Sequence, residues 1–269
     1  MKTKFTVPKI LDLYRRGEKL AMATAYDATF ARLVDEAGVE MILVGDSLGM
    51  VVQGHESTLP VTLEDVIYHT RCVSRGATRS LVVADLPFMS YQASRTQAML
   101  AAGRAMKEGC AAAVKIEGGL EMAETVSLMT AAGIPVVAHI GLKPQSVHVM
   151  GGYKIQGKNV AGARLLVEEA RVFERAGAFA LVLEGVAIET AAEVTGAVGI
   201  PTVGIASGPH CSGQVLVIYD MLGMNPEFKP TFLKTYADGH KVVTTAVRRY
   251  VDEVKRGRFP TASHGFHRK

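Results

Sequence analysis

The stretch MILVGDSLG, at positions 41–49 of this 269-residue sequence, carries the clearest indication of the fold. Four apolar residues lead to Gly45, and Asp46 and Ser47 follow immediately. A near-continuous apolar run is typical of a parallel strand buried on both faces, and α/β proteins place their sites at the C-terminal ends of such strands. We therefore expect a buried strand that presents a carboxylate and a hydroxyl at one face of the fold.

The same pattern recurs along the chain. Four further apolar runs each end in one ionisable residue: LVVAD at 81–85, AVKIE at 113–117, VVAH at 136–139 and ALVLE at 180–184. Three more strands are expected at 20–26, 201–205 and 214–218. Eight strand–helix units in one series favour an α/β fold, a TIM (β/α)8 barrel. A helix expected at 6–16 would be an extra N-terminal element that closes the bottom of the barrel.

Length and composition favour one large domain. With 48% hydrophobic residues and no linker rich in Pro, Gly or Ser, residues 1–269 are predicted to form a single barrel domain. The net charge of +4 is spread along the chain, so we expect no nucleic-acid partner. Anionic small-molecule substrates are compatible with this mild positive charge.

Cysteines and apolar segments bear on the cellular location. Cys72, Cys110 and Cys211 are too few and too scattered for a disulfide framework or a CxxC metal site, so we expect reduced thiols. No stretch approaches the roughly 20 apolar residues of a membrane span, and the N-terminus lacks the apolar region of a signal peptide. We expect a cytoplasmic protein without a membrane partner.

Two long connections are predicted to belong to the site. Residues 48–60 (LGMVVQGHESTLP) follow the strand at 41–44, and residues 140–159 (IGLKPQSVHVMGGYKIQGKN) follow the strand that ends at His139. Loops of this length in a compact domain are usually functional. We interpret both as active-site loops.

Acidic side chains close three consecutive strands. Asp46 and Asp85 end neighbouring strands, so in a barrel they face each other across the C-terminal mouth. Two carboxylates that close repel unless a proton or a cation lies between them, and hard oxygen ligands favour Mg²⁺ or Mn²⁺. Glu117 closes the next strand and is a candidate to hold a metal-bound water. The alternative is that each acid caps the following helix.

Four further residues are candidates for substrate binding and catalysis. Lys115 lies on the same side of its strand as the acid that closes it, and it pairs either with carboxylates nearby or with a substrate carboxylate. His139 is either a catalyst or a satisfied structural residue. The apolar approach to Glu184 predicts a raised pKa, as a general base needs. Ser47 can donate through its hydroxyl, whereas Ser207 is interpreted as a turn residue.

The longer motifs resemble one known family. The sequence lacks GxxxxGK[ST], a Rossmann GxGxxG, HExxH and GxSxG, so nucleotide-dependent and serine-hydrolase functions lose support. It contains, in this order, AYD, VGDSLGMVVQGHESTLPVTL, ADLPFMSY, AVKIEGG, HIGLKPQS, GGYKIQG, VLEGV and GQVLV. This set covers essentially the whole chain and resembles the ketopantoate hydroxymethyltransferase family.

The resemblance implies a TIM barrel of the phosphoenolpyruvate/pyruvate superfamily, assembled as a homo-oligomer, usually a decamer, in pantothenate and coenzyme A synthesis. The family transfers a hydroxymethyl group from the co-substrate 5,10-methylenetetrahydrofolate to the 2-oxo acid 3-methyl-2-oxobutanoate. A Mg²⁺-stabilised enolate leads to 2-dehydropantoate. Carried over, the metal ligands are Asp46 and Asp85, with Glu117 acting through water, and the base is Glu184. Substrate contacts fall on Asp46, Ser47, Asp85, Lys115 and His139.

The sequence departs from the family pattern after the seventh expected strand. Ala206 and Ser207 stand in GIASG where the family has GIGAG, and Ser212 replaces the carboxylate of CDGQ. Lys143 replaces the usual Thr of HIGLTPQS. We expect these changes to affect the hydrogen bonding of the loop after that strand and not the metal site.

Two other functions stay open at this point. One keeps the barrel and the metal but makes the protein a carbon–carbon or carbon–phosphorus lyase or mutase of the same superfamily. That function lacks support for a catalytic Cys, because none of the three cysteines follows a strand end in the required loop. The other is a catalytically silent barrel with a structural or assembly role, motivated by the changed loop.

Overall fold

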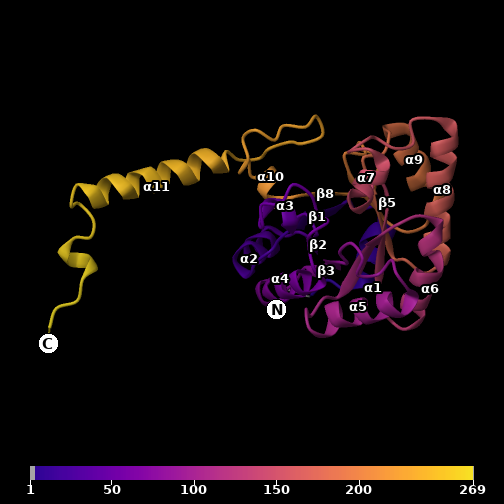
Figure 1. Cartoon of the computed structure of the whole chain (residues 1–269), viewed down its shortest axis with the longest axis horizontal. Coiled ribbons are helices and arrows are strands. Elements are labelled where there is room, and N and C mark those ends of the chain that lie inside the picture. Colours follow the sequence, from indigo (N-terminus) through magenta and orange to yellow (C-terminus); the bar gives the residue numbers. More distant parts are fainter. Residues whose placement is uncertain (1–3, 269) are drawn as a thin grey trace. The chain divides into compact units, whose positions relative to one another are not determined.

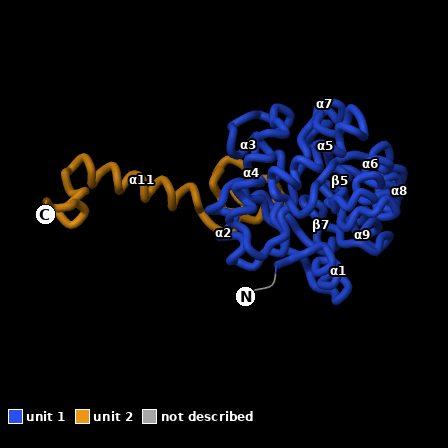
Figure 2. The backbone as a smooth tube through the Cα atoms, turned by 90° about the horizontal axis from the view of Figure 1, so that it is seen from below, with its two compact units in different colours: residues 1–217 blue, residues 218–269 orange. Residues whose placement is uncertain are grey.

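The computed structural model describes residues 4–268. The chain divides into two compact units, Met1–Val217 and Ile218–Lys269 (Figure 2). All eight strands and every residue expected at the site belong to the first unit. That the whole chain, 1–269, forms one domain stays a prediction.

Eight parallel strands form a closed barrel in sequence order, with β8 paired to β1 (Figure 1). The strands are β1 (Leu20–Thr24), β2 (Met41–Val44), β3 (Leu81–Asp85), β4 (Ala113–Glu117), β5 (Val136–Gly141), β6 (Ala180–Glu184), β7 (Thr202–Ile205) and β8 (Gly213–Leu216). Strands β2 to β5 are buried along their whole length, as their Val, Ile and Leu content predicts. The predicted TIM barrel is confirmed.

Helices connect most of the strands. They are α1 (Val7–Arg15), α2 (Ala28–Ala37), α3 (Leu48–Val51), α4 (Leu63–Gly76), α5 (Arg95–Lys107), α6 (Ala123–Ala131), α7 (Val147–Met150), α8 (Val160–Arg175) and α9 (Ile188–Ala197), with the 3-10 turns η1 (Leu120–Met122) and η2 (Pro144–Ser146). Residues 206–212, between β7 and β8, form no helix. The series of eight strand–helix units therefore lacks a helix after β7, where Gly, Pro and Ser favour a turn-rich loop.

The extra N-terminal helix, α1, closes the bottom of the barrel. Its Ile10 and Leu13 are buried in one core cluster with Leu20, Met41 and Leu81, the first residues of β1, β2 and β3. These residues lie at the N-terminal ends of the strands, opposite the expected site. The apolar side of α1 therefore covers the end of the barrel that carries no predicted chemistry.

Asp35, near the end of α2, fixes the same end of the barrel. Its carboxylate accepts hydrogen bonds from Thr78, Arg79 and Ser80, in the segment that precedes β3. Burial alone raises the pKa of Asp35, but these hydrogen bonds outweigh it and lower the pKa to about 2. The ionised side chain therefore ties α2 to β3.

The two long connections are partly helical. Residues 48–60 contain α3, and residues 140–159 contain η2 and α7. Gln156 anchors the second connection to the C-terminal end of β6: its N–H donates to Gly185 O at 2.7 Å, and its carbonyl accepts from Ala187 N at 3.0 Å. The backbone thus holds this connection beside the end of β6.

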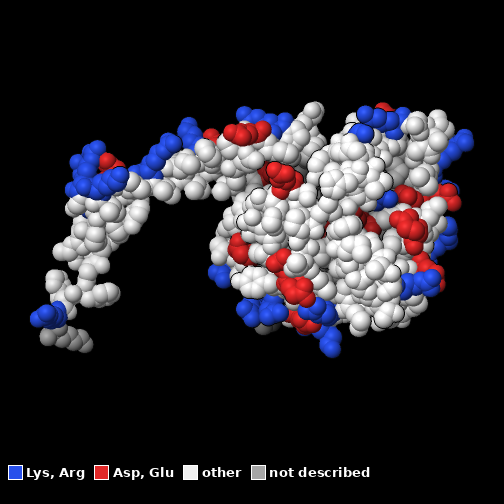
Figure 3. All heavy atoms as spheres, viewed as in Figure 1, with Lys and Arg blue, Asp and Glu red and all other residues white. Residues whose placement is uncertain are grey.

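The second unit contains α10 (Ile218–Met221), α11 (Gly239–Lys255) and η3 (Ala262–His264). A helix expected at 232–255 begins later, at Gly239, where Asp238 accepts a hydrogen bond from Lys241 N. Basic side chains line one edge of α11 in view (Figure 3). No residue of α11 is buried, and one of its faces carries exposed Val243, Val247, Tyr250 and Val254.

Within residues 4–268, no helix is long and apolar enough to cross a membrane.

Candidate active site at the C-terminal mouth of the barrel

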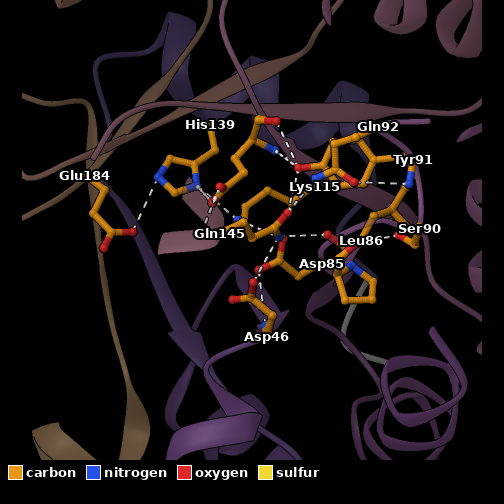
Figure 4. A network of polar contacts seen from close by, with 12 residues as sticks. Asp46, Asp85, Leu86, Ser90, Tyr91, Gln92, Lys115, His139, Gln145 and Glu184 are labelled. Atoms are coloured by element: carbon orange, nitrogen blue, oxygen red, sulfur yellow. Dashed lines mark hydrogen bonds and ion pairs between the residues drawn. The ribbon is translucent and has the colours of Figure 1, made fainter. Parts of the chain in front are cut away.

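All seven residues expected at the site lie on neighbouring strands or directly after them. Asp46 and Ser47 follow β2, Asp85 ends β3, Lys115 and Glu117 lie on β4, His139 lies on β5 and Glu184 ends β6. In the parallel register, Asp85 is opposite Lys115 and Glu117 is opposite His139. Figure 4 shows the side chains of Asp46, Asp85, Lys115, His139 and Glu184 turned toward one another.

Lys115 is the cation at the centre of this group. Its Nζ lies 2.7 Å from Asp85 Oδ1 and 3.2 Å from His139 Nδ1, and the residue is only 4% exposed. Burial lowers the pKa of Lys115, but the charges of Asp85, Asp46 and Glu117 outweigh it and raise the pKa. Lys115 therefore stays an ammonium, and its ion-pair partner is Asp85, one of the nearby carboxylates that the sequence offered.

Asp46 and Asp85 form a buried pair of carboxyl groups. The Asp46 N–H donates to Asp85 Oδ2 at 3.2 Å, and Gln145 Nε2 donates to Asp46 Oδ2 at 2.9 Å. Burial raises the pKa of both groups, that of Asp85 to about 7, and Lys115 offsets this only in part. The pair is therefore short of positive charge.

This donor set suits a hard divalent cation. Mg²⁺ is commonly bound by one or two carboxylates and completes its shell with water or substrate oxygens. No group of three or more His, Cys, Asp or Glu side chains within residues 4–268 is arranged to hold a metal ion. The fit therefore rests on the two carboxylates of Asp46 and Asp85.

Glu117 is turned toward other partners. Its Oε1 accepts a hydrogen bond from Gln145 N at 3.0 Å, and its Oε2 lies 3.7 Å from His139 Nδ1. Burial raises the pKa of Glu117 to about 9, against the lowering effect of Lys115. A role for Glu117 beside a metal stays a prediction.

His139 and Glu184 form the other half of the site. Burial, together with the charge of Lys115, lowers the pKa of His139 well below its ordinary value, so the ring is neutral. Because the Lys115 ammonium can only donate, Nδ1 accepts and the proton lies on Nε2. This Nε2 lies 3.4 Å from Glu184 Oε2, yet has no well-aligned hydrogen-bond partner among the described residues. Burial raises the pKa of Glu184 to about 8.

The alternative that the acids are helix caps is wrong. The residues at the N-caps of α3, α4 and α5 are Ser47, Thr62 and Ser94, and Gly119 holds this position before η1. Thr62 forms a capping box with Asp65. The carboxylates at the ends of β2, β3 and β4 therefore do not cap the helices that follow them.

Ser47 faces the mouth from the start of α3. Its hydroxyl lies 2.9 Å from the hydroxyl of Tyr26, which follows β1. A nearby ring nitrogen, His69 Nδ1, lies 2.6 Å from the Tyr26 carbonyl oxygen. The position of the Ser47 hydroxyl therefore depends on a residue from a neighbouring strand end.

The sequence did not single out three buried polar residues of the site. Gln145 lies in η2, Tyr91 lies in the loop after β3, and Tyr26 follows β1. All three occur inside the motifs quoted above, but polar residues in loops carry no periodic signal of burial. Only the way the loops converge shows that Gln145 contacts Asp46, that Tyr91 contacts Glu117 and that Tyr26 contacts Ser47.

The changed loop between β7 and β8 is fully hydrogen-bonded at its serines. The Ser207 hydroxyl donates to Leu183 O at 2.7 Å and accepts from Val186 N at 3.1 Å, in keeping with a structural role. Ser212 N donates to Thr202 Oγ1 at 3.2 Å. Ser212 therefore ties the loop to β7 without the usual carboxylate.

Solved structures with the same fold define the class of protein. A 2,3-dimethylmalate lyase, described as a PEP mutase/isocitrate lyase superfamily member, superposes with a TM-score of 0.61 and 16% identity, over 98% of this chain and 90% of the other. A phosphonopyruvate hydrolase in complex with oxalate and Mg²⁺ superposes with a TM-score of 0.60 and 14% identity, over 98% and 92%. The protein therefore shares the TIM-barrel fold of these structures.

Sequence comparison is more specific. The profile of the ketopantoate hydroxymethyltransferase family matches residues 4–262. The 3-methyl-2-oxobutanoate hydroxymethyltransferase of Geotalea daltonii is 52% identical over 266 residues, which cover 99% of this chain and 100% of the relative. This chain belongs to the ketopantoate hydroxymethyltransferase family of enzymes.

Proposed function

We propose that this protein transfers a hydroxymethyl group from 5,10-methylenetetrahydrofolate to 3-methyl-2-oxobutanoate and forms 2-dehydropantoate, in the synthesis of pantothenate and coenzyme A. The observation that carries the proposal is the convergence of Asp46, Asp85, Lys115, His139 and Glu184 at one barrel mouth in a chain of this family. The site has the charges that a 2-oxo acid requires: one ammonium, a cation-binding pair of carboxylates and a separate proton acceptor.

Asp46 and Asp85 are the proposed Mg²⁺ ligands, with Glu117 acting through water. The solved phosphonopyruvate hydrolase complex with oxalate and Mg²⁺ supports this choice of metal through its shared fold. When bound, Mg²⁺ supplies a Lewis acid that stabilises negative charge on the 2-oxo oxygen. A divalent cation also relieves the repulsion within the buried carboxylate pair.

The remaining residues bind the substrate and move its proton. The Lys115 ammonium and the Ser47 hydroxyl hold the substrate carboxylate, and the His139 Nε2–H donates to a substrate oxygen. Glu184 accepts the proton from the branched carbon beside the ketone. That carbon then bonds to the methylene carbon of the folate donor. Water supplies the hydroxyl oxygen, both C–N bonds of the methylene group break, and tetrahydrofolate leaves with protons on its two nitrogens. Burial raises the pKa of Glu184 to about 8, against the lowering effect of Lys115, which puts it near the range of a useful base.

Deuterium exchange tests this proposal without the folate. Incubation of the protein with Mg²⁺ and 3-methyl-2-oxobutanoate in D₂O is expected to exchange the proton on the branched carbon, followed by NMR. Absence of exchange, with or without folate, would favour a catalytically silent barrel. Exchange without transfer from 5,10-methylenetetrahydrofolate would favour a lyase or mutase.

Glu184→Gln tests the base. The exchange rate is expected to fall about 10²–10⁴-fold, because the amide cannot accept the proton, while metal binding is retained. Glu189→Gln, which changes an exposed acid of α9, is the matched control. An unchanged exchange rate in Glu184→Gln would remove Glu184 from this role.

We also propose that the protein is a homo-oligomer, a decamer as in the resemblance, in the cytoplasm. The exposed apolar face of α11 supports an assembly, because apolar surface on a helix is normally covered. The free thiols of Cys72, Cys110 and Cys211 support a reducing compartment. Light scattering on a sizing column measures the assembly, and a monomer would contradict it.

A further inference from the structure

Gln145 uses its whole side-chain amide inside the site. It lies in η2, after β5, and is 4% exposed. Its Oε1 accepts from the Tyr91 hydroxyl and from Gln92 Nε2, each at 2.9 Å. Its Nε2 donates to Asp46 Oδ2 at 2.9 Å and to Leu86 O at 3.0 Å (Figure 4). All four positions of the amide are therefore occupied.

These partners fix which way the amide points. The Leu86 carbonyl oxygen can only accept a hydrogen bond, and a metal-binding Asp46 carboxylate can only accept as well. The end of the Gln145 amide that faces them must therefore be the NH₂ group. The Gln92 amide nitrogen, which can only donate, holds the oxygen end, and the buried Tyr91 hydroxyl shares its one proton between Gln145 Oε1 and the Glu117 carbonyl oxygen.

The backbone of Gln145 contacts a second acid. Its N–H donates to Glu117 Oε1 at 3.0 Å, and the Glu117 N–H donates to the Tyr91 hydroxyl at 3.1 Å. One residue of the 140–159 connection therefore contacts the acids that follow β2 and end β4. The side chain of Tyr91 joins the loop after β3 to the same network.

We propose that Gln145 is a positioning residue for the cation site. Its amide donates to one carboxylate oxygen of Asp46, while its backbone N–H donates to the Glu117 carboxylate. The seating of the connection after β5 is thereby coupled to the orientation of both acids. The inference rests on the proposed metal site, and it assigns Gln145 a role that acts through Asp46.

Gln145→Met tests the proposal, because Met keeps a similar volume and removes every hydrogen bond of the amide. The dissociation constant for Mn²⁺, measured by calorimetry without substrate, is expected to rise about 10–100-fold, as is typical when a partner of a metal ligand is lost. Gln97→Met is the matched control, since the Gln97 amide donates to Met89 O, away from the acids. Mn²⁺ binding within about twofold of the unsubstituted protein would overturn the proposal.

Tyr91→Phe keeps the test decisive if Gln145→Met does not fold. It removes the hydroxyl that orients the amide and leaves the Gln145 NH₂ group in place, so a weaker loss of Mn²⁺ affinity, a few-fold, is expected. Unchanged Mn²⁺ affinity in folded Tyr91→Phe would contradict the network. If the unsubstituted protein bound no Mn²⁺, the proposed metal site itself would fail. If the unsubstituted protein and a folded Gln145→Met variant bound Mn²⁺ equally tightly, the metal site would stand and only the role of Gln145 would be contradicted.

Discussion

Asp35 at the bottom of the barrel and Asp85 at the mouth both expose almost no surface, 3% and 2%, but Asp85 lies deeper in the protein and their pKa values shift in opposite directions. Burial raises the pKa of Asp35, and hydrogen bonds from Thr78, Arg79 and Ser80 more than reverse this, to about 2. The bottom of the barrel thus holds an ionised acid whose negative charge is stabilised by hydrogen bonds.

Asp85 lacks that compensation. Burial raises its pKa to about 7, the charge of Asp46 adds to the rise, and Lys115 opposes it only in part. The depth of burial and the donors around each acid together therefore decide its protonation state. An acid that accepts several hydrogen bonds, such as Asp35, stabilises the fold. The carboxylate pair of Asp46 and Asp85 has too little positive charge around it and is suited to bind a cation.

Asp46→Asn should produce the largest effect, and it should act on activity alone. The neutral amide weakens the cation site, so deuterium exchange into 3-methyl-2-oxobutanoate is expected to fall about 10³-fold, which corresponds to about 4 kcal/mol of lost stabilisation. The melting temperature is expected to stay nearly constant, because the change removes a like charge beside Asp85. Retained exchange would place the metal elsewhere.

Asp35→Asn should do the reverse. Its amide NH₂ group faces backbone and hydroxyl donors, so the free energy of unfolding is expected to fall by about 2–4 kcal/mol. At fixed protein concentration this lowers the melting temperature by roughly 6–12 °C. The deuterium exchange rate of the folded variant should be unchanged. A loss of exchange without a loss of stability would contradict a purely structural role for Asp35.

Acid should remove the contribution of Asp35 in a defined window. A carboxyl with a folded pKa of about 2 and an ordinary value of 3.8 stabilises the fold above about pH 4, by about 2 kcal/mol. This stability is lost as the pH falls toward about 2, because the unfolded chain binds the proton first. Denaturant midpoints of the protein and of Asp35→Asn should converge across this window; parallel curves would contradict the assignment.

Mg²⁺ should have the smallest effect, and one that depends on pH at the mouth. Because the pKa of Asp85 is raised to about 7, protons compete with the cation below that pH. Mg²⁺ at ten times its dissociation constant is expected to stabilise the protein by about 1.4 kcal/mol above that pH, and progressively less as the pH falls through it. Thermal melting with and without EDTA measures this. An equal Mg²⁺ shift at all pH values would argue against a cation at Asp85.

Much of the barrel could be predicted because its signals are local. The apolar runs that end in Asp46, Asp85 and Glu184 mark strands whose C-terminal ends meet in any parallel barrel. The turn-rich segment between β7 and β8 was expected as a loop, but the C-terminal helix, expected from Phe232, begins at Gly239. This error falls where an exposed segment weakens the apolar period.

The pairing of the charged groups was harder to predict. Sequence spacing places Lys115 near Glu117, but the parallel register brings it opposite Asp85, 2.7 Å away. The hydrogen bonds of Gln145 to Asp46 and Tyr91 join residues from three separate loops. No spacing rule connects such residues, because their distance depends on how the loops pack.

The strand pattern, the family motifs and the acids at the barrel mouth can be recognised from the sequence, since hydrophobic period and residue type are properties of the chain. Which buried acid receives enough hydrogen bonds and positive charge depends on the folded structure. Desolvation, charge and hydrogen bonding act through space, so Asp35 and Asp85 acquire opposite pKa shifts from neighbours that the sequence separates by many residues.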